Sequence, residues 1–168
     1  VVPVQQFISM MDRDVVSLKH RGVGSVGGMA IFECLRENSH IQALDMEDNQ
    51  LGLNVDVESG HLEHITSALS ENQVLTHLDL SYNNLAARGC AAVAEALEHN
   101  NSIKELSLRG NNMGDNGAQA LAESLLKSSK LTKLDLSDNC VDHPAQVTPT
   151  PTLTLTTGPN PNPNPNQV

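Results

Sequence analysis

The sequence contains very few aromatic residues. Phe7, Phe32 and Tyr82 are the only ones, and aromatic side chains make up 2% of the 168 residues. A core built on large rings is therefore excluded, and branched aliphatic side chains, chiefly leucine, must supply the buried apolar surface. The length suits about one domain, which excludes a large enzyme of several domains.

Cysteines and long apolar runs are also scarce. Cys34, Cys90 and Cys140 are odd in number and far apart, which argues against a disulfide framework and against a cysteine-based zinc site. We therefore expect a reducing compartment, the cytoplasm. An apolar run of about 18 residues and a signal-peptide pattern are both missing, so we expect a soluble chain. The sequence begins at Val1 rather than methionine, which leaves open that it is cut from a longer product.

Basic residues are few compared with acidic ones. Twenty acidic residues face ten basic ones, and the net charge is -10. Nucleic-acid backbones and anionic lipid surfaces carry the same sign of charge, so neither is expected as the main partner. We expect an unidentified protein partner with a basic or mixed surface.

The sequence does contain an internal repeat. The apolar and asparagine positions of Leu75–Leu85 recur 28 residues later in Ile103–Met113 and again in Leu131–Val141. An earlier copy, Ile41–Leu51, precedes Leu75 by 34 residues. A fifth, degenerate copy has apolar residues at Val16, Leu18 and Val23, with Arg21 in place of the asparagine.

Each copy continues with a helical pattern. In Gly89–Leu97 and Gly117–Leu125 the apolar residues fall four apart, on one face of a helix. A short strand whose leucines point inward, covered by one helix on the outside, has a hydrophobic face that only neighbouring units can close. The units should therefore stack into a solenoid. The asparagine at each strand exit can pair with backbone groups left free by the turn, and we expect a buried ladder of Asn49, Asn83, Asn111 and Asn139.

This pattern resembles the leucine-rich repeat, and the 28-residue period resembles its ribonuclease-inhibitor-type subclass. The resemblance covers about residues 13–142 and implies a right-handed α/β solenoid, with a curved parallel sheet on the concave side and helices on the convex side. Val1–Phe7, Ser17–Gly24 and Met46–Gly52 are similar to the leucine-rich repeat-containing protein 74 family. The repeats are also similar to those of NOD-like receptors and of the GTPase activator RanGAP, although the acidic tail of RanGAP is not present here.

The domain organisation follows from the repeat. Residues 1–142 should form the repeat domain, with a degenerate first unit and an incomplete last one. The second unit carries six extra residues between Leu51 and His61, which should bulge as a surface loop with or without a function. From His143 the sequence becomes rich in threonine, proline and asparagine, and we expect residues 143–168 to be disordered.

The C-terminal edge of the array raises a separate question. No polar cap is visible after the fifth unit, so we expect either a truncated product or an open edge that self-associates through residues 131–141. The alternation in Thr152–Thr157 leaves open that the tail folds back as a short covering strand.

Two motifs suggest other chemistry. Gly22, Gly24 and Gly27, with Asp45 further on, fit a dinucleotide-binding pattern. Gly24 and Gly27 also align with Gly114 and Gly117 of a later unit, so we interpret them as repeat glycines. His61 and His64 lie near Glu58 but do not match a zinc motif, and we interpret them as solvated helix residues. We expect no catalytic group, metal or cofactor.

The outward-pointing strand residues define the candidate binding surface. Reading outward from the two inward leucines gives a central column of Ser17, Asp45, Asp79, Ser107 and Asp135. Beside it run Lys19, Glu47, Ser81, Arg109 and Ser137, and then His20, Asp48, Tyr82, Gly110 and Asp138. We predict protein binding through Asp45, Glu47, Asp48, Asp79, Tyr82, Arg109 and Asp135. A solvated polar face without a ligand remains the alternative, and so do a regulator of a small GTPase and a nucleotide-binding enzyme.

Overall fold

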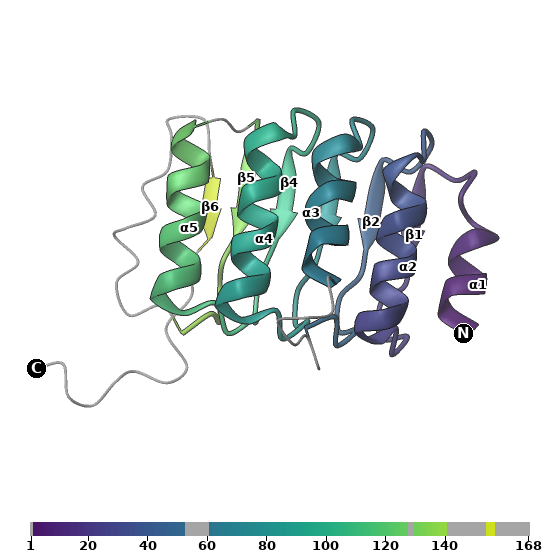
Figure 1. Cartoon of the computed structure of the whole chain (residues 1–168), viewed down its shortest axis with the longest axis horizontal. Helices are drawn as coiled ribbons and strands as arrows, with labels where there is room; N and C mark the ends of the chain where they lie inside the picture. Colours follow the sequence, from purple (N-terminus) through teal and green to yellow (C-terminus); the bar gives the residue numbers. More distant parts are fainter. Residues whose placement is uncertain (1, 53–60, 128–129, 141–153, 157–168) are drawn as a thin grey trace, which may run out of the picture.

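The computed structural model describes residues 2–52, 61–127, 130–140 and 154–156. Short strands alternate with helices along the chain (Figure 1). The helices are α1 (Val2–Ile8), α2 (Gly24–Arg36), α3 (His61–Glu71), α4 (Ala86–His99) and α5 (Gly114–Lys127). The strands are β1 (Val15–Ser17), β2 (Ala43–Asp45), β3 (His77–Asp79), β4 (Glu105–Ser107), β5 (Lys133–Asp135) and β6 (Thr154–Thr156).

The strands form one parallel sheet in the order of the sequence, from β1 to β6. Equivalent repeat positions pair across the sheet, as Leu44 with Leu78 and Leu78 with Leu106. The helices cover one face of this sheet (Figure 1). This is the α/β solenoid that the repeat predicted, because each strand needs its helix and its neighbours to bury its leucines. The register of β2 with β3 is kept although the second unit is longer, and residues 53–60 of the insertion lie outside the described residues.

The core lies between the sheet and the helices. The strands contribute Leu44, Leu78, Leu106 and Leu134, and all four are buried. The helix side contributes Ile31, Leu35, Leu69, Val93, Leu97 and Leu121. Burial of each such side chain is worth about 1.5 to 3 kcal/mol, so aliphatic residues build this core almost without rings. Among the described residues, no helix is both long and apolar enough to cross a lipid bilayer.

The N-terminal end carries a helix that was not predicted from the sequence. Helix α1 lies beside α2 at this end of the solenoid (Figure 1). The Phe7 ring is completely buried, and Val4 packs against the same core. Helix α1 therefore covers apolar surface that the first unit of the stack would otherwise expose to water.

The C-terminal edge differs from the expected open edge. Strand β6 pairs in parallel with β5, and the backbone N–H of Leu136 donates to the carbonyl of Thr156 at 2.8 Å. The expectation of disorder is therefore wrong for residues 154–156, because the alternating sequence adds a sixth strand to the sheet. The rest of the tail lies outside the described residues, and its disorder stays a prediction.

Candidate functional site

Asn49, Asn83, Asn111 and Asn139 are all buried at the strand exits. In Asn111 the amide nitrogen donates to the carbonyl of Leu80 in the preceding unit at 2.8 Å and to Leu108 in its own unit at 3.0 Å. Its amide oxygen accepts the backbone N–H groups of Asn83 and Leu85. Each of these side chains therefore links two units, which fixes the turns that carry the outermost columns of the sheet face.

A second set of asparagines, not predicted from the sequence, lies where α2, α3 and α4 lead into the next strand. Asn38, Asn72 and Asn100 are buried. The amide nitrogen of Asn100 donates to the carbonyls of Leu69 and Asn72, and its oxygen accepts the N–H groups of Ser102 and Ile103. The signal was an asparagine three residues before the apolar residue that opens the repeats at Ile41, Leu75 and Ile103. Asn100 also begins a glycosylation sequon, but its amide nitrogen is buried and already bonded.

The glycine motif belongs to the repeat turns. The N–H of Gly24 donates to the carbonyl of Asn49 at 2.8 Å, and the N–H of Gly114 donates to that of Asn139 at 3.0 Å. Ala86 occupies the same position in the β3 unit and bonds to Asn111. The backbone donor that a nucleotide phosphate would need at Gly24 is therefore already used within the fold.

The sheet face carries one more column than was predicted from the sequence. The strands begin one residue before the first inward leucine, so the entry column consists of Val15, Ala43, His77, Glu105 and Lys133. Together with the central column of Ser17, Asp45, Asp79, Ser107 and Asp135, it lines a groove of about 430 Å³ across β1 to β5. Val15 is 67% exposed, so the β1 end of this groove is apolar. The period of two along a strand was the signal for this column.

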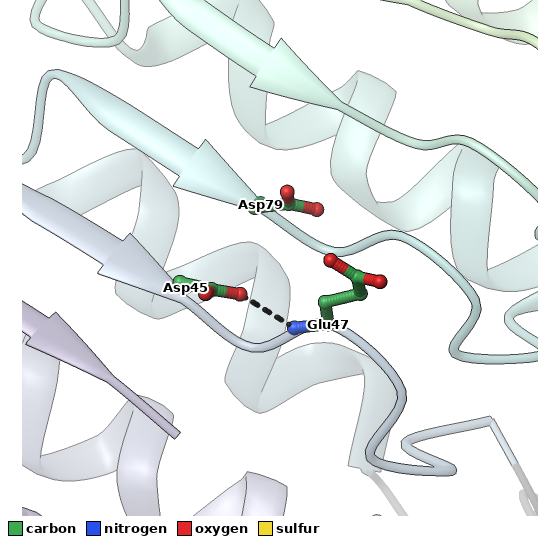
Figure 2. A group of neighbouring side chains, drawn as sticks. All are labelled: Asp45, Glu47 and Asp79. Carbon is green, nitrogen blue, oxygen red and sulfur yellow. Dashed lines mark hydrogen bonds between the residues drawn. The ribbon is translucent and has the colours of Figure 1, made fainter. Parts of the chain in front are cut away.

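A cluster of three carboxylates lies at the carboxyl ends of β2 and β3. Figure 2 shows Asp45, Glu47 and Asp79 together there, and one carboxylate oxygen of each lies within 4.8 Å of the others. The Lys19 ammonium donates to Glu47, and this bond, with the charges of Asp45 and Asp79, raises the pKa of Lys19. A single lysine thus offsets three carboxylates. Carboxylates also suit hard cations, but Glu47 already has a cationic partner and Oδ1 of Asp45 accepts the N–H of Glu47.

The aspartates of the central column also have a structural role. Oδ1 of Asp79 accepts the N–H of Ser81 at 2.8 Å, and Oδ1 of Asp135 accepts the N–H of Ser137 at 2.9 Å. These bonds hold the start of each turn. Each bond uses one oxygen and an uncharged backbone donor, so the bond itself does not neutralise the carboxylate.

Tyr82, Arg109 and Asp138 form a contact across three units at the outer edge of the face. The Tyr82 hydroxyl donates to Oδ2 of Asp138 at 3.1 Å, and Nε of Arg109 donates to the same oxygen at 2.9 Å. The Arg109 guanidinium lies 5.7 Å from the centre of the Tyr82 ring. The hydrogen bonds from Arg109 and Tyr82 lower the pKa of Asp138, whereas burial and the bond to Asp138 raise the pKa of Tyr82. The ring is half exposed and held in place.

Other acidic residues of the sheet face are in ion pairs. Glu105 lies 3.3 Å from Lys133 and 3.4 Å from Nε2 of His77, and Asp48 lies 2.8 Å from Nδ1 of His20. The predicted binding residues thus fall into two groups. Asp45, Glu47 and Asp79 gather over β2 and β3, and Tyr82 and Arg109 gather with Asp138 near β5. Asp135 and Asp48 stand outside both groups.

Within the described part of the chain, the other candidate groups give no second site. Nδ1 of His64 lies 3.1 Å from Glu33 on α2, which is a surface pair; Glu58 and the side chain of His61 lie outside the described residues. Cys90 is buried, and burial raises the pKa of its thiol to about 12, so it stays protonated at neutral pH. Cys34, Cys90 and Cys140 are free thiols.

The architecture is that of a repeat solenoid with one helix for each strand. The family model described as "Leucine Rich repeat" matches residues 37–54, 71–94, 99–122 and 127–143. The protein therefore contains leucine-rich repeats, and its fold is an α/β leucine-rich-repeat solenoid. The solved structure of "Leiomodin-1 Actin-Binding Site 2 (ABS2)" is similar, with a TM-score of 0.67 and 19% sequence identity over 79% of this chain and 76% of that chain. At this identity the similarity concerns the fold.

Proposed function

We propose that this protein is a non-catalytic scaffold that binds a partner protein with a basic or mixed surface on its sheet face. The observation that carries the proposal is a set of carboxylates on that face without cationic partners of their own within the described part of the chain. Among the described residues, Asp45, Asp79 and Asp135 lack cationic partners that would neutralise them individually, and they line an open groove. Leucine-rich repeats generally mediate contacts between proteins, which supports the same conclusion.

The carboxylates of this face should make binding depend on the salt concentration. Asp45 and Asp79 occupy paired positions on neighbouring strands, about 4.8 Å apart. Their repulsion weakens the free protein slightly and is relieved when a basic group approaches. Binding should therefore become weaker as added salt screens the charges.

Affinity capture followed by mass spectrometry tests the proposal. The charge-reversed variant with Asp45→Lys and Asp79→Lys should lose the partners that the native protein retains. A matched variant with Glu95→Lys and Glu123→Lys reverses two exposed charges on α4 and α5 and should keep them. Equal retention by both variants would refute binding through the sheet face.

The finer family assignments belong to the same proposal. The 28-residue unit with a full helix supports the ribonuclease-inhibitor-type subclass, and the segments Val1–Phe7, Ser17–Gly24 and Met46–Gly52 support the leucine-rich repeat-containing protein 74 family. Regulation of a small GTPase is the second candidate, supported by the similarity of the repeats to RanGAP. The similar leiomodin structure is an actin-binding site of that protein, so purified actin is a useful defined partner to include in the capture experiment.

A further inference from the structure

We infer that the groove on the sheet face binds a basic amphipathic α-helix lying across the strands. This inference rests on the proposed function, since it specifies the partner of the same face. It starts from the contents of the groove, which combines an apolar β1 end with the carboxylates of Asp45, Asp79 and Asp135.

The spacing of the carboxylates matches one face of a helix. Asp45 and Asp79 are on adjacent strands, and Asp135 lies two strands beyond Asp79. Strands are about 4.8 Å apart, so these intervals are about 5 and 10 Å. A helix rises about 1.5 Å per residue. Basic residues at positions i, i+3 and i+10 of a helix are therefore about 4.5 and 10.5 Å apart along its axis, and all three lie on one side.

An extended segment fits the groove less well. Its side chains on one face repeat about every 6.6 Å, which exceeds the interval between Asp45 and Asp79. The strand backbones bond to their neighbours within the sheet, so a peptide lying on the face finds no backbone partners there. A helix satisfies its own backbone groups and can cover the apolar end of the groove without leaving them unpaired.

The width of the face agrees with a helix. The distance from the entry column to the column of Lys19 is four residues along the chain, or about 13 Å. A helix with its side chains is about 10 to 12 Å across. Val15 and Ala43 line the β1 end of the groove, so the bound helix should carry an apolar residue one turn before its first basic residue.

Lys19 should compete with the basic side chains of the bound helix for the same carboxylates. Its ammonium donates to Glu47 and lies in the field of Asp45 and Asp79. A basic side chain of the bound helix would occupy the same negative potential. Replacing Lys19 by methionine keeps its length, removes its charge and leaves the three carboxylates unopposed, so it should strengthen binding.

Fluorescence anisotropy with synthetic peptides tests the inference. The first probe is a helix-stabilised peptide with lysines at i, i+3 and i+10 and a leucine one turn before the first lysine. The second has the same composition with the lysines spread around the helix, and the third carries a central proline. We expect the first to bind about ten-fold more tightly than either of the others. Asp79→Asn should weaken its binding about two- to five-fold, Lys19→Met should strengthen it, and Glu95→Gln on α4 should leave it unchanged.

Two results would overturn the inference. Equal binding of all three peptides would show that charge alone, without helical register, determines affinity. Unchanged binding by Asp79→Asn and Lys19→Met would show that the helix binds elsewhere. Neither result contradicts the scaffold proposal if the variant with Asp45→Lys and Asp79→Lys still loses its partners in the capture experiment. The two proposals can therefore fail separately.

Discussion

The amide oxygen of Asn111 accepts the backbone N–H of Asn83, 28 residues earlier, at 3.1 Å. Asn139 holds Asn111 in the same way at 2.9 Å. Each unit of the solenoid thus supplies the acceptor that the preceding turn needs. Because these groups are buried, the loss of one side chain leaves several backbone groups without partners.

Replacement of Asn111 by leucine should therefore destabilise the protein. The carbonyls of Leu80 and Leu108 and two N–H groups would lose their partner, and we expect a loss of about 1 to 3 kcal/mol of unfolding free energy. Urea denaturation measures this change. Asn101→Leu, at an exposed position in the connection between α4 and β4, is the matched control. An Asn111→Leu protein as stable as the control would contradict the structural role of the ladder.

The repeat explains which features could be predicted from the sequence. The leucine and asparagine positions recur at a fixed interval, so the strands, the helices and the Asn111 position were accessible without coordinates. Residues 28 apart become neighbours, so the bond between Lys19 and Glu47 was implicit in the same interval. Helix α1 and strand β6 lie outside the repeat. The position of α1 depends on apolar surface exposed at the N-terminal end, which the repeat does not encode. The alternation in Thr152–Thr157 left a covering strand open for β6, but it did not determine the pairing with β5.

Gly52 provides a test of the close approach between two turns. A Cβ atom at this position would lie 2.0 Å from the carbonyl oxygen of Asn84. Gly52→Ala should therefore force the backbone apart and cost about 3 kcal/mol, because the atoms that the Cβ meets belong to the backbone. Gly24→Ala is the control, because it has open space and a φ of +66°, and should cost only about 1 to 2 kcal/mol of backbone strain. Thermal melting of the two variants measures the difference; a Gly24 variant that melts below the Gly52 variant would argue against the close contact.

Tyr82 is the only tyrosine, so its ionisation can be followed directly by absorbance of the phenolate. Burial and the hydrogen bond to Asp138 raise its pKa above the ordinary value of 10.0. We expect Asp138→Asn to lower the midpoint, while Asp12→Asn, far along the chain, should not. A raised pKa stabilises the fold below the unfolded pKa and loses this contribution as the pH rises through the folded value. Stability should therefore fall on the alkaline side of about pH 10, and an unchanged midpoint in the Asp138 variant would exclude the bond.

The contact of Tyr82, Arg109 and Asp138 should also lose its contribution to stability at acidic pH. The pKa of Asp138 is lowered from its ordinary value of 3.8, chiefly by the hydrogen bond from Arg109. A lowered pKa contributes stability above the unfolded value and loses it as the pH falls through the folded value. The native protein should lose this contribution below about pH 4, whereas Arg109→Met should show a smaller acid dependence. Melting temperatures measured from neutral pH to below pH 4 distinguish the native protein from Arg109→Met, with Lys104→Met as the control. Identical profiles would show that Arg109 and Asp138 do not form an ion pair.

The pairing of β6 with β5 predicts the effect of shortening the tail. Without residues 145–168, β5 would become the edge of the sheet, and the N–H of Leu136 would lose its bond to Thr156. An uncovered parallel edge is a template for pairing with another chain. We therefore expect this deletion to lower the melting temperature and to raise light scattering at micromolar concentration. Deletion of residues 157–168 alone keeps β6 and should change neither quantity. If the longer deletion were as stable and as monomeric as the shorter one, β6 would not protect the edge. The stability of the last unit would then have to come from the pairing of β5 with β4 and the burial of Leu134.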